Sequence, residues 1–219
     1  LDSPLVRACV IQGPTGSGKT TLVRSWMLQQ DRRGPLLWVS LDDGITTRTA
    51  FWHHVVALAV RMGGLDREQA AAIESQLGQE LDPVRIAACV LSAAGPVILA
   101  LDAYEHLGDA SARIDADLAR LLLEVPQLRV TITTRGHTAL ADLDLPGPGF
   151  VRVITLGELA LTADEVGALI ESQTGIEDEQ LAASVAHATR GFPLTVRAVV
   201  LALSQLGRIP GVDAMDWDT

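Results

Sequence analysis

The chain has 219 residues, 48% of them hydrophobic, and a formal net charge of −10. This length allows one large domain or a domain with a smaller companion, and the apolar content is ample for a buried core. The negative charge, with no basic cluster, argues against a nucleic-acid surface on this segment. No apolar run approaches the length of a membrane span, and the start lacks the features of a signal peptide. We therefore expect a cytoplasmic protein without membrane contact, and a start without methionine suggests a piece of a longer chain.

The segment GPTGSGKTT, residues 13–21, follows an apolar, strand-like run and precedes a helix-like one. It fits the pattern G-x-x-x-x-G-K-[ST], in which backbone N–H groups close around phosphate oxygens at a helix N-terminus. Lys19, the only lysine of the chain, is expected to reach the β- and γ-phosphates, and the Thr20 hydroxyl is expected to bind Mg²⁺. A glycine-rich turn with a surface lysine is disfavoured, because every other cationic residue is arginine. The predicted nucleotide-binding residues are Gly13, Pro14, Thr15, Gly16, Ser17, Gly18, Lys19, Thr20 and Thr21.

Strand-like and helix-like segments alternate along the first two thirds of the chain, which predicts a parallel sheet with helices on both faces. Strands are expected within residues 6–12, 35–41, 97–101, 128–135 and 150–156, and helices within 20–30, 49–62, 82–95 and 111–125. The helix of residues 82–95 has Asp82 as its N-cap, Pro83 at its first position and Gly95 as its stop. The expected fold class is α/β, a three-layer P-loop NTPase fold around a central parallel five-stranded sheet.

Two residues at strand ends complete the predicted site. Asp102 ends VILALD, a Walker B pattern whose carboxylate holds Mg²⁺ through its waters. Arg135 ends TITTR, where it either senses the γ-phosphate or lies on the surface. Ligands of parallel sheets bind beyond the carboxyl ends of the strands, so Gly13, Asp42, Asp102 and Arg135 are expected to face one site. Lys19, Asp102 and Arg135 are the predicted catalytic residues.

The residue after Asp102 bears on hydrolysis. Many P-loop ATPases carry a second acidic residue there to polarise the attacking water, but this chain has Ala103. Glu105, Asp42 or Asp43 could take that role, or no residue takes it. We expect slow ATP hydrolysis.

From about residue 155 onward the pattern is helical, with helices expected in 161–175, 178–191 and 192–207. Thr162 and Glu165 form a capping box at the start of the first. The predicted domains are a P-loop nucleotide-binding domain over residues 1–156 and a small helical lid over 157–219, truncated at its C-terminal end.

The remaining metal-binding or redox-active residue types predict little chemistry. Cys9 and Cys89 fall in a strand-like and a helix-like run, and both are expected to be buried free thiols. The five histidines have no ligand spacing, so a zinc site is not expected.

The chain resembles the STAND class of signalling ATPases and, within it, the MalT-like, LuxR-type bacterial transcriptional regulators. The segments that carry the resemblance are GPTGSGKTTL, LLWVSLDDGITTRTAFWHHVVALAV, VILALDAYEHL with the later TITTR, and TRGFPLTVRAVVLAL. The last looks like the family's Gly-x-Pro motif at the start of a lid helix, here Gly191, Phe192 and Pro193, and LTADEVGALIESQTG is similar to the family's first lid helix. Together these segments cover most of the chain, and the Phe-Trp helix and the GFPL segment discriminate best.

The resemblance implies a signalling switch that uses ATP, ADP and Mg²⁺. In the family, ADP holds a closed, inactive monomer and ATP permits an open form that oligomerises. Pro193 matches the family's Gly-x-Pro proline, which lies beside the adenine, so the resemblance implies the same position for Pro193. The implied partners are the nucleotide and either a second copy or other domains of the full-length protein, with DNA bound only through domains absent here. Two other readings stay open: a turnover ATPase or P-loop kinase acting on a small molecule, and a non-hydrolysing scaffold.

Overall fold

A computed structural model describes residues 5–29, 34–41, 44–62, 82–142 and 149–206, together with positions 68 and 75. Its contacts divide the chain into two units. The first comprises residues 1–13 and 19–155, and the second comprises residues 14–18 and 156–219.

The first unit alternates strands and helices along the chain. Its elements are β1 (Ala8–Gln12), α1 (Lys19–Gln29), β2 (Leu36–Ser40), α2 (Arg48–Met62), α4 (Pro83–Ala93), β3 (Val97–Asp102), the 3₁₀ segment η1 (Tyr104–Ala110), α5 (Ser111–Glu124), β4 (Leu128–Thr134), the 3₁₀ segment η2 (Ala139–Asp142) and β5 (Val151–Ile154).

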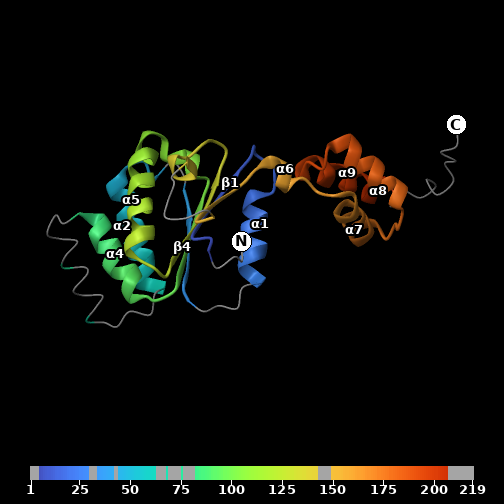
Figure 1. Cartoon of the computed structure of the whole chain (residues 1–219). Helices are drawn as coiled ribbons and strands as arrows, with labels where there is room; N and C mark the ends of the chain where they lie inside the picture. Colours follow the sequence, from blue (N-terminus) through green and yellow to red (C-terminus); the bar gives the residue numbers. More distant parts are fainter. Residues whose placement is uncertain are drawn as a thin grey trace, which may run out of the picture. The chain divides into compact units, whose positions relative to one another are not determined.

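The five strands form one sheet in the order β2-β3-β4-β1-β5, and every neighbouring pair is parallel. Helices α2, α4 and α5 lie on one face of the sheet and α1 on the other (Figure 1). The predicted α/β fold with a central parallel five-stranded sheet is therefore confirmed. Because all five strands are parallel, the residues that follow β1, β3 and β4 emerge at the same edge of the sheet.

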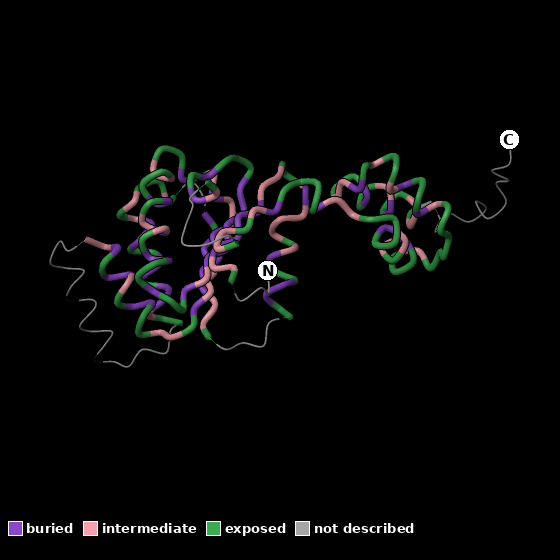
Figure 2. The backbone as a smooth tube through the Cα atoms, viewed as in Figure 1, coloured by how far each residue is buried: buried purple, intermediate pink, exposed green. Residues whose placement is uncertain are grey.

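The core of this unit lies between the sheet and the α2, α4 and α5 layer. Figure 2 shows buried residues concentrated along the strands and the inward helix faces. Phe51 and Trp52 on α2 are fully buried, and their rings meet edge to face with centroids 4.8 Å apart. Helix α4 starts as predicted: the Asp82 carboxylate accepts a hydrogen bond from the Val84 N–H, and Pro83 follows the cap.

Four polar residues of the helical layer, Arg48, Trp52, Asp82 and Asp117, form what we call the α2–α5 cluster. The Arg48 guanidinium donates to both carboxylate oxygens of Asp117, at 2.6 and 3.0 Å, and to Asp82 at 3.1 Å. The Trp52 indole N–H donates to Asp117 at 2.7 Å. These hydrogen bonds raise the pKa of Arg48, and the cluster ties together helices that are distant in sequence.

Arg7, just before β1, fixes the start of that strand. Its guanidinium donates to the backbone carbonyl oxygens of Leu128 at 2.8 Å, Val125 at 2.7 Å and Leu122 at 3.2 Å. Leu122 lies in the last turn of α5 and Val125 is its C-cap, and the last carbonyls of a helix have no partner within it. One side chain thus binds β1 to the turn between α5 and β4.

The second unit is helical, with α6 (Leu156–Leu159), α7 (Ala163–Thr174), α8 (Glu179–Thr189) and α9 (Pro193–Leu206). The predicted capping box of Thr162 and Glu165 opens α7. A small core forms between α7, α8 and α9, and its buried members are Val166, Ile170, Ala182, Val185, Val196 and Val200. Gly191 makes the turn into α9 with φ +65°, and a β-carbon there would lie 2.3 Å from the Leu161 carbonyl oxygen.

The expectation of two buried thiols is wrong for Cys89. Cys9 is buried in β1, but Cys89 is exposed on α4. It follows exposed Arg85 by four positions, so the two share the solvent face of the helix, while Ile86 and Val90 face the core. Among the described residues, none of the helices has the length and apolarity needed to span a bilayer.

Candidate functional site

The glycine loop, residues 13–18, joins β1 to α1. Gly16 and Gly18 adopt φ values of +84° and +85°, in the left-handed region that favours glycine. Ser17 is buried, and both its N–H and its hydroxyl donate to the Pro14 carbonyl oxygen, the hydroxyl at 2.8 Å. This conformation is the kind of backbone turn that presents successive N–H groups to an anion.

Lys19 is the first residue of α1. Its ammonium group donates to the Gly13 carbonyl oxygen at 2.7 Å, across the base of the loop. Partial burial lowers the pKa of Lys19, while the carboxylates of Glu105 and Asp102 raise it and Arg135 lowers it further. The structure therefore brings the three predicted catalytic residues, Lys19, Asp102 and Arg135, into one electrostatic neighbourhood with Glu105.

A pair of hydroxyl groups holds Asp102 at the end of β3. Thr20 donates to its Oδ1 at 2.8 Å, and Thr133 donates to the same oxygen at 2.5 Å. The sheet register explains the second contact: β3 and β4 pair Leu101 with Ile132, so Asp102 and Thr133 come next to each other. A Mg²⁺ ion bound to phosphate takes oxygen ligands from a hydroxyl group and a carboxylate. Thr20 and Asp102 supply these two groups at hydrogen-bond distance from each other, so they fit the ion.

Ala103, at the position where many P-loop ATPases have a second acidic residue, has a left-handed backbone with φ +61° and ψ +47°. Its N–H donates to the Thr133 hydroxyl oxygen at 3.1 Å. In the η1 segment that follows this turn, Glu105 contacts Arg135 at the end of β4. A non-glycine residue in this region stores strain of the kind found at functional sites.

Arg135 follows β4 and is paired with Glu105 of η1. Its Nε donates to Glu105 Oε1 at 2.5 Å, and its backbone N–H donates to Oε2 at 3.1 Å. Burial raises the pKa of Glu105, but hydrogen bonds from its own backbone and from Arg135 outweigh that effect and hold the pKa below its ordinary value. The Gly13 N–H donates to the Thr134 carbonyl oxygen, so Arg135 lies beside the start of the glycine loop.

Three other predicted positions are Asp42, Asp43 and Pro193. Asp42 and Asp43 lie outside the described residues. Pro193 begins α9 in the second unit, which also includes residues 14–18. Within that unit the Leu194 N–H donates to the Gly16 carbonyl oxygen at 3.1 Å, and a β-carbon at Gly18 would lie 3.5 Å from the Pro193 ring.

Sequence reasoning missed Thr133 and the support behind η1. Thr133 sits inside a buried strand, where a β-branched residue is ordinary, and only its register against Asp102 reveals its role. Tyr104 donates to Asp115 on α5 at 2.8 Å, and the other oxygen of Asp115 accepts from the Ala139 N–H at 2.8 Å. Burial raises the pKa of Asp115, which is 2% exposed, against the effect of these hydrogen bonds. A buried aspartate on an otherwise apolar helix face was the available signal.

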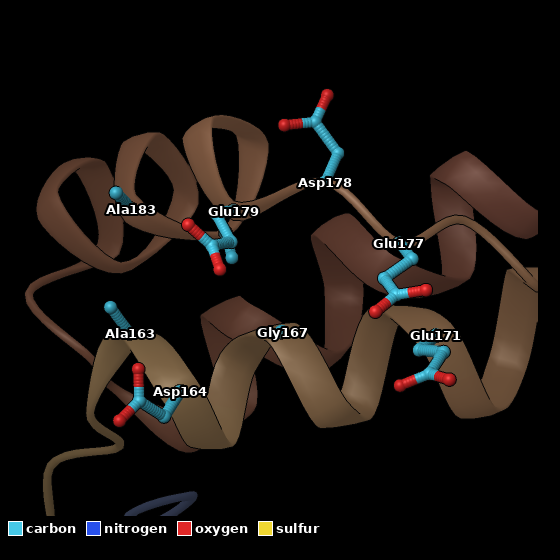
Figure 3. A pocket seen from close by; sticks show the side chains of 9 residues that line it. Ala163, Asp164, Gly167, Glu171, Glu177, Asp178, Glu179 and Ala183 are labelled. Carbon is cyan, nitrogen blue, oxygen red and sulfur yellow. The ribbon is translucent and has the colours of Figure 1, made fainter.

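A groove of about 420 Å³ lies between α7 and α8 of the second unit. It is lined by Ala163, Asp164, Gly167, Glu171, Glu177, Asp178, Glu179, Ala182 and Ala183. Figure 3 shows Glu177 and Glu179 pointing toward α7 and Asp178 pointing away from it. Five carboxylates without a cationic lining residue repel phosphate, so this groove is not a nucleotide site. Within the described residues, no cluster of histidine, cysteine and acidic side chains has the arrangement of a metal site.

Comparison with known proteins places the chain by its fold. No protein-family model matches it, and no curated protein matches it. Similar solved structures include the Walker-type ATPase PABY2304 of Pyrococcus abyssi, with 13% identity, a TM-score of 0.58, and coverage of 95% of this chain and 65% of that one. Drosophila ORC bound to DNA has 16% identity and a TM-score of 0.51, and the match covers 91% of this chain and 55% of that one. Cdc6p from Pyrobaculum aerophilum has 17% identity and a TM-score of 0.51, with coverage of 92% of this chain and 56% of that one. The chain thus spans less than two thirds of each neighbour, and at these identities the likeness shows a shared Walker-type ATPase fold.

Proposed function

We propose that this chain is the nucleotide-binding switch module of a larger signalling ATPase. The observation that carries the proposal is the joint placement of Lys19 at the base of the glycine loop and of Thr20 against Asp102. The sequence pattern alone permits a chance match, but a chance match has no reason to bring a hydroxyl from α1 within 2.8 Å of a carboxylate at the end of β3. The Walker-type fold of the structural neighbours supports the same reading.

In this proposal the residues of the loop, 13–18, bind the phosphates through their N–H groups, and Lys19 binds them through its ammonium group. Thr20 and Asp102 hold Mg²⁺, which when bound neutralises phosphate charge. Thr133 orients the Asp102 carboxylate by donating to its Oδ1. Pro193 lies beside the adenine.

We propose further that retention of the nucleotide matters more than its turnover. Ala103 has no group that could accept a proton from water, and its N–H is engaged by Thr133. The sequence resembles segments of the MalT-like, LuxR-type regulators. In that family a bound nucleotide selects between two conformations of the protein. In that setting ADP and ATP select between a monomer and an assembly.

The first test is to denature the purified chain and identify any released nucleotide by chromatography. The proposal expects ADP in near-stoichiometric amount from the wild type and none from Lys19→Ala. Arg85→Ala is the matched control, because it removes an exposed cation from α4 and should retain nucleotide as the wild type does. If the wild type carries no nucleotide and binds neither Mg-ADP nor Mg-ATP in solution, the proposal is wrong.

Two further measurements separate the switch from the alternatives. Light scattering with ADP and with a non-hydrolysable ATP analogue reports whether assembly depends on the nucleotide, as a switch requires. Steady-state phosphate release reports turnover, for which we expect less than about one event per minute, far below the values of about 1 to 10³ per second typical of enzymes. Fast turnover without assembly would favour an enzyme.

A further inference from the structure

We propose that Glu105 competes with the terminal phosphate of ATP for Arg135, and that it thereby sets a preference of the site for nucleoside diphosphate over triphosphate. This inference rests on the proposed nucleotide-binding function and adds a residue that determines specificity. It assigns Glu105 to ligand selection, whereas the sequence offered it only as one of several possible substitutes for a missing acid.

The first support is the way in which Arg135 is engaged. Both oxygens of Glu105 are used, one by the side chain of Arg135 and the other by its backbone N–H. His106 adds a weak contact, with its Nε2 at 3.5 Å from Arg135 Nη2. The guanidinium prefers paired oxygens, and a phosphate presents the same oxygen geometry as a carboxylate. A terminal phosphate that binds the Nε side of this guanidinium therefore displaces Glu105 from it.

The second support is position. Arg135 directly follows Thr134, whose carbonyl oxygen accepts a hydrogen bond from the Gly13 N–H. Glu105 raises the pKa of Lys19 and Arg135 lowers it, so both lie within electrostatic range of Lys19. The Glu105–Arg135 pair thus lies next to the groups that bind phosphate. A diphosphate held by the loop and Lys19 leaves the pair intact. A triphosphate adds negative charge on the side where the pair lies.

The third support is that Glu105 cannot easily withdraw. On one side of it, the Ala103 N–H is bonded to Thr133 and the Tyr104 hydroxyl to Asp115. On the other side, the His106 ring contacts the Leu41 carbonyl oxygen at 2.8 Å. Tyr104 and the neighbouring Leu107 are buried. If a terminal phosphate takes Arg135, the Glu105 carboxylate stays in place without its cation and repels that phosphate.

The side-chain exposures set the size of the effect. Glu105 is 20% exposed and Arg135 is 50% exposed, so solvent screens the pair partly. Competition for Arg135 and repulsion of the phosphate act in the same direction. Together we expect them to change relative affinity by about fivefold, the upper end for a partly exposed ion pair.

The test is to measure the dissociation constants of Mg-ADP and of a non-hydrolysable Mg-ATP analogue by calorimetry. Glu105→Gln keeps the size of the side chain and an acceptor for the Arg135 N–H but removes the charge. We expect tighter binding of the ATP analogue by about fivefold and an unchanged affinity for ADP. Glu124→Gln is the matched control, because it breaks an ion pair with Arg120 on the exposed face of α5 and should change neither constant.

A second variant keeps the inference testable if Glu105→Gln folds poorly. Arg135→Gln removes the contested cation, and we expect weaker binding of the ATP analogue with ADP unchanged. If Glu105→Gln changes both nucleotides equally, or changes their ratio no more than Glu124→Gln does, Glu105 has no selective role. Failure of the proposed function gives a different result, in which the wild type binds neither nucleotide.

Discussion

Two charged clusters of the first unit differ in the partners that their charged side chains have. In the α2–α5 cluster, Arg48 is satisfied by carboxylates of its own chain, and Trp52 supplies a further donor to Asp117. At the strand ends, Asp102 receives hydrogen bonds from the neutral hydroxyls of Thr20 and Thr133, and no arginine of the described residues forms an ion pair with it. Charges matched by opposite charges hold helices together. A carboxylate whose hydrogen bonds come from hydroxyls keeps its charge available to a cation. Substitutions should therefore separate stability in the first cluster from ligand binding in the second.

The largest effect on stability is expected from Asp117→Ala. It leaves the Arg48 guanidinium with Asp82 alone and the Trp52 N–H without its acceptor. Breaking a buried pair costs about 3 to 5 kcal/mol, and we expect about 2 to 3 kcal/mol here because Arg48 is 31% exposed. Urea unfolding measures the change, and Asp109→Ala, an exposed acid in η1, is the control. Loss of nucleotide binding from a fully folded Asp117→Ala protein would contradict the division of roles between the clusters.

Asp102→Asn should have the reverse profile. Asparagine retains an oxygen that can accept from Thr20 and Thr133, so we expect the free energy of unfolding to stay within about 1 kcal/mol of the wild type. The lost charge should remove the gain in nucleotide affinity that Mg²⁺ provides, a change of about tenfold or 1.4 kcal/mol. Calorimetry with Mg²⁺ and with a chelator measures that gain. A variant that keeps the full Mg²⁺ effect would show that Asp102 does not hold the ion.

Tyr104→Phe tests the support behind the strand ends through pH. The pKa of Asp115 is raised, so the folded state keeps its proton longer than the unfolded chain, and this contribution to stability is lost as pH rises from the ordinary carboxyl range through the raised value. Tyr104 opposes that loss by donating to the ionised carboxylate. We therefore expect Tyr104→Phe to cost about 1 kcal/mol at pH 8 and less in mild acid. Unfolding at several pH values measures this, and a pH-independent cost would assign Tyr104 a packing role only.

The smallest effect is expected from Ala103→Gly. A left-handed backbone costs a non-glycine residue about 1 to 2 kcal/mol, and the extra freedom of glycine in the unfolded chain offsets roughly half of that. We expect a gain of about 0.5 kcal/mol. Arg190→Gly, at the left-handed residue that ends α8, should gain a similar amount and serves as the comparison. Destabilisation by Ala103→Gly alone would mean that its methyl group contributes packing that outweighs the strain.

Local rules predicted the features that depend on near neighbours in sequence. The Asp82 cap, the Thr162 capping box and the apolar strand ending at Asp102 each depend on a few adjacent residues, and each is present. The glycine loop also has a sequence pattern, because only glycine adopts the backbone at Gly16 and Gly18 without strain.

The contacts that sequence could not supply span long separations. Thr133 is 31 positions from Asp102, and Asp117 is 69 positions from Arg48. Each residue is ordinary in its own segment, and only strand register or helix packing brings the partners together. Cys89 shows the same limit on a smaller scale, because its helix was predicted but the face on which it lies was not. Glu105 and Arg135 were both noticed, but their pairing follows from the left-handed turn at Ala103.

The position of β1 in the sheet also has a consequence for synthesis of the protein. The strand that carries the glycine loop is made first, yet the Arg7 contact that fixes it spans 121 residues, and its pairing partners are β4 and β5. A ribosome adds about 5 to 20 residues per second, so the nascent β1 waits several seconds for its neighbours. The phosphate-binding loop is therefore made before the strands that pair with β1, and it takes shape only after them. A bound nucleotide then reports that translation has passed beyond β5.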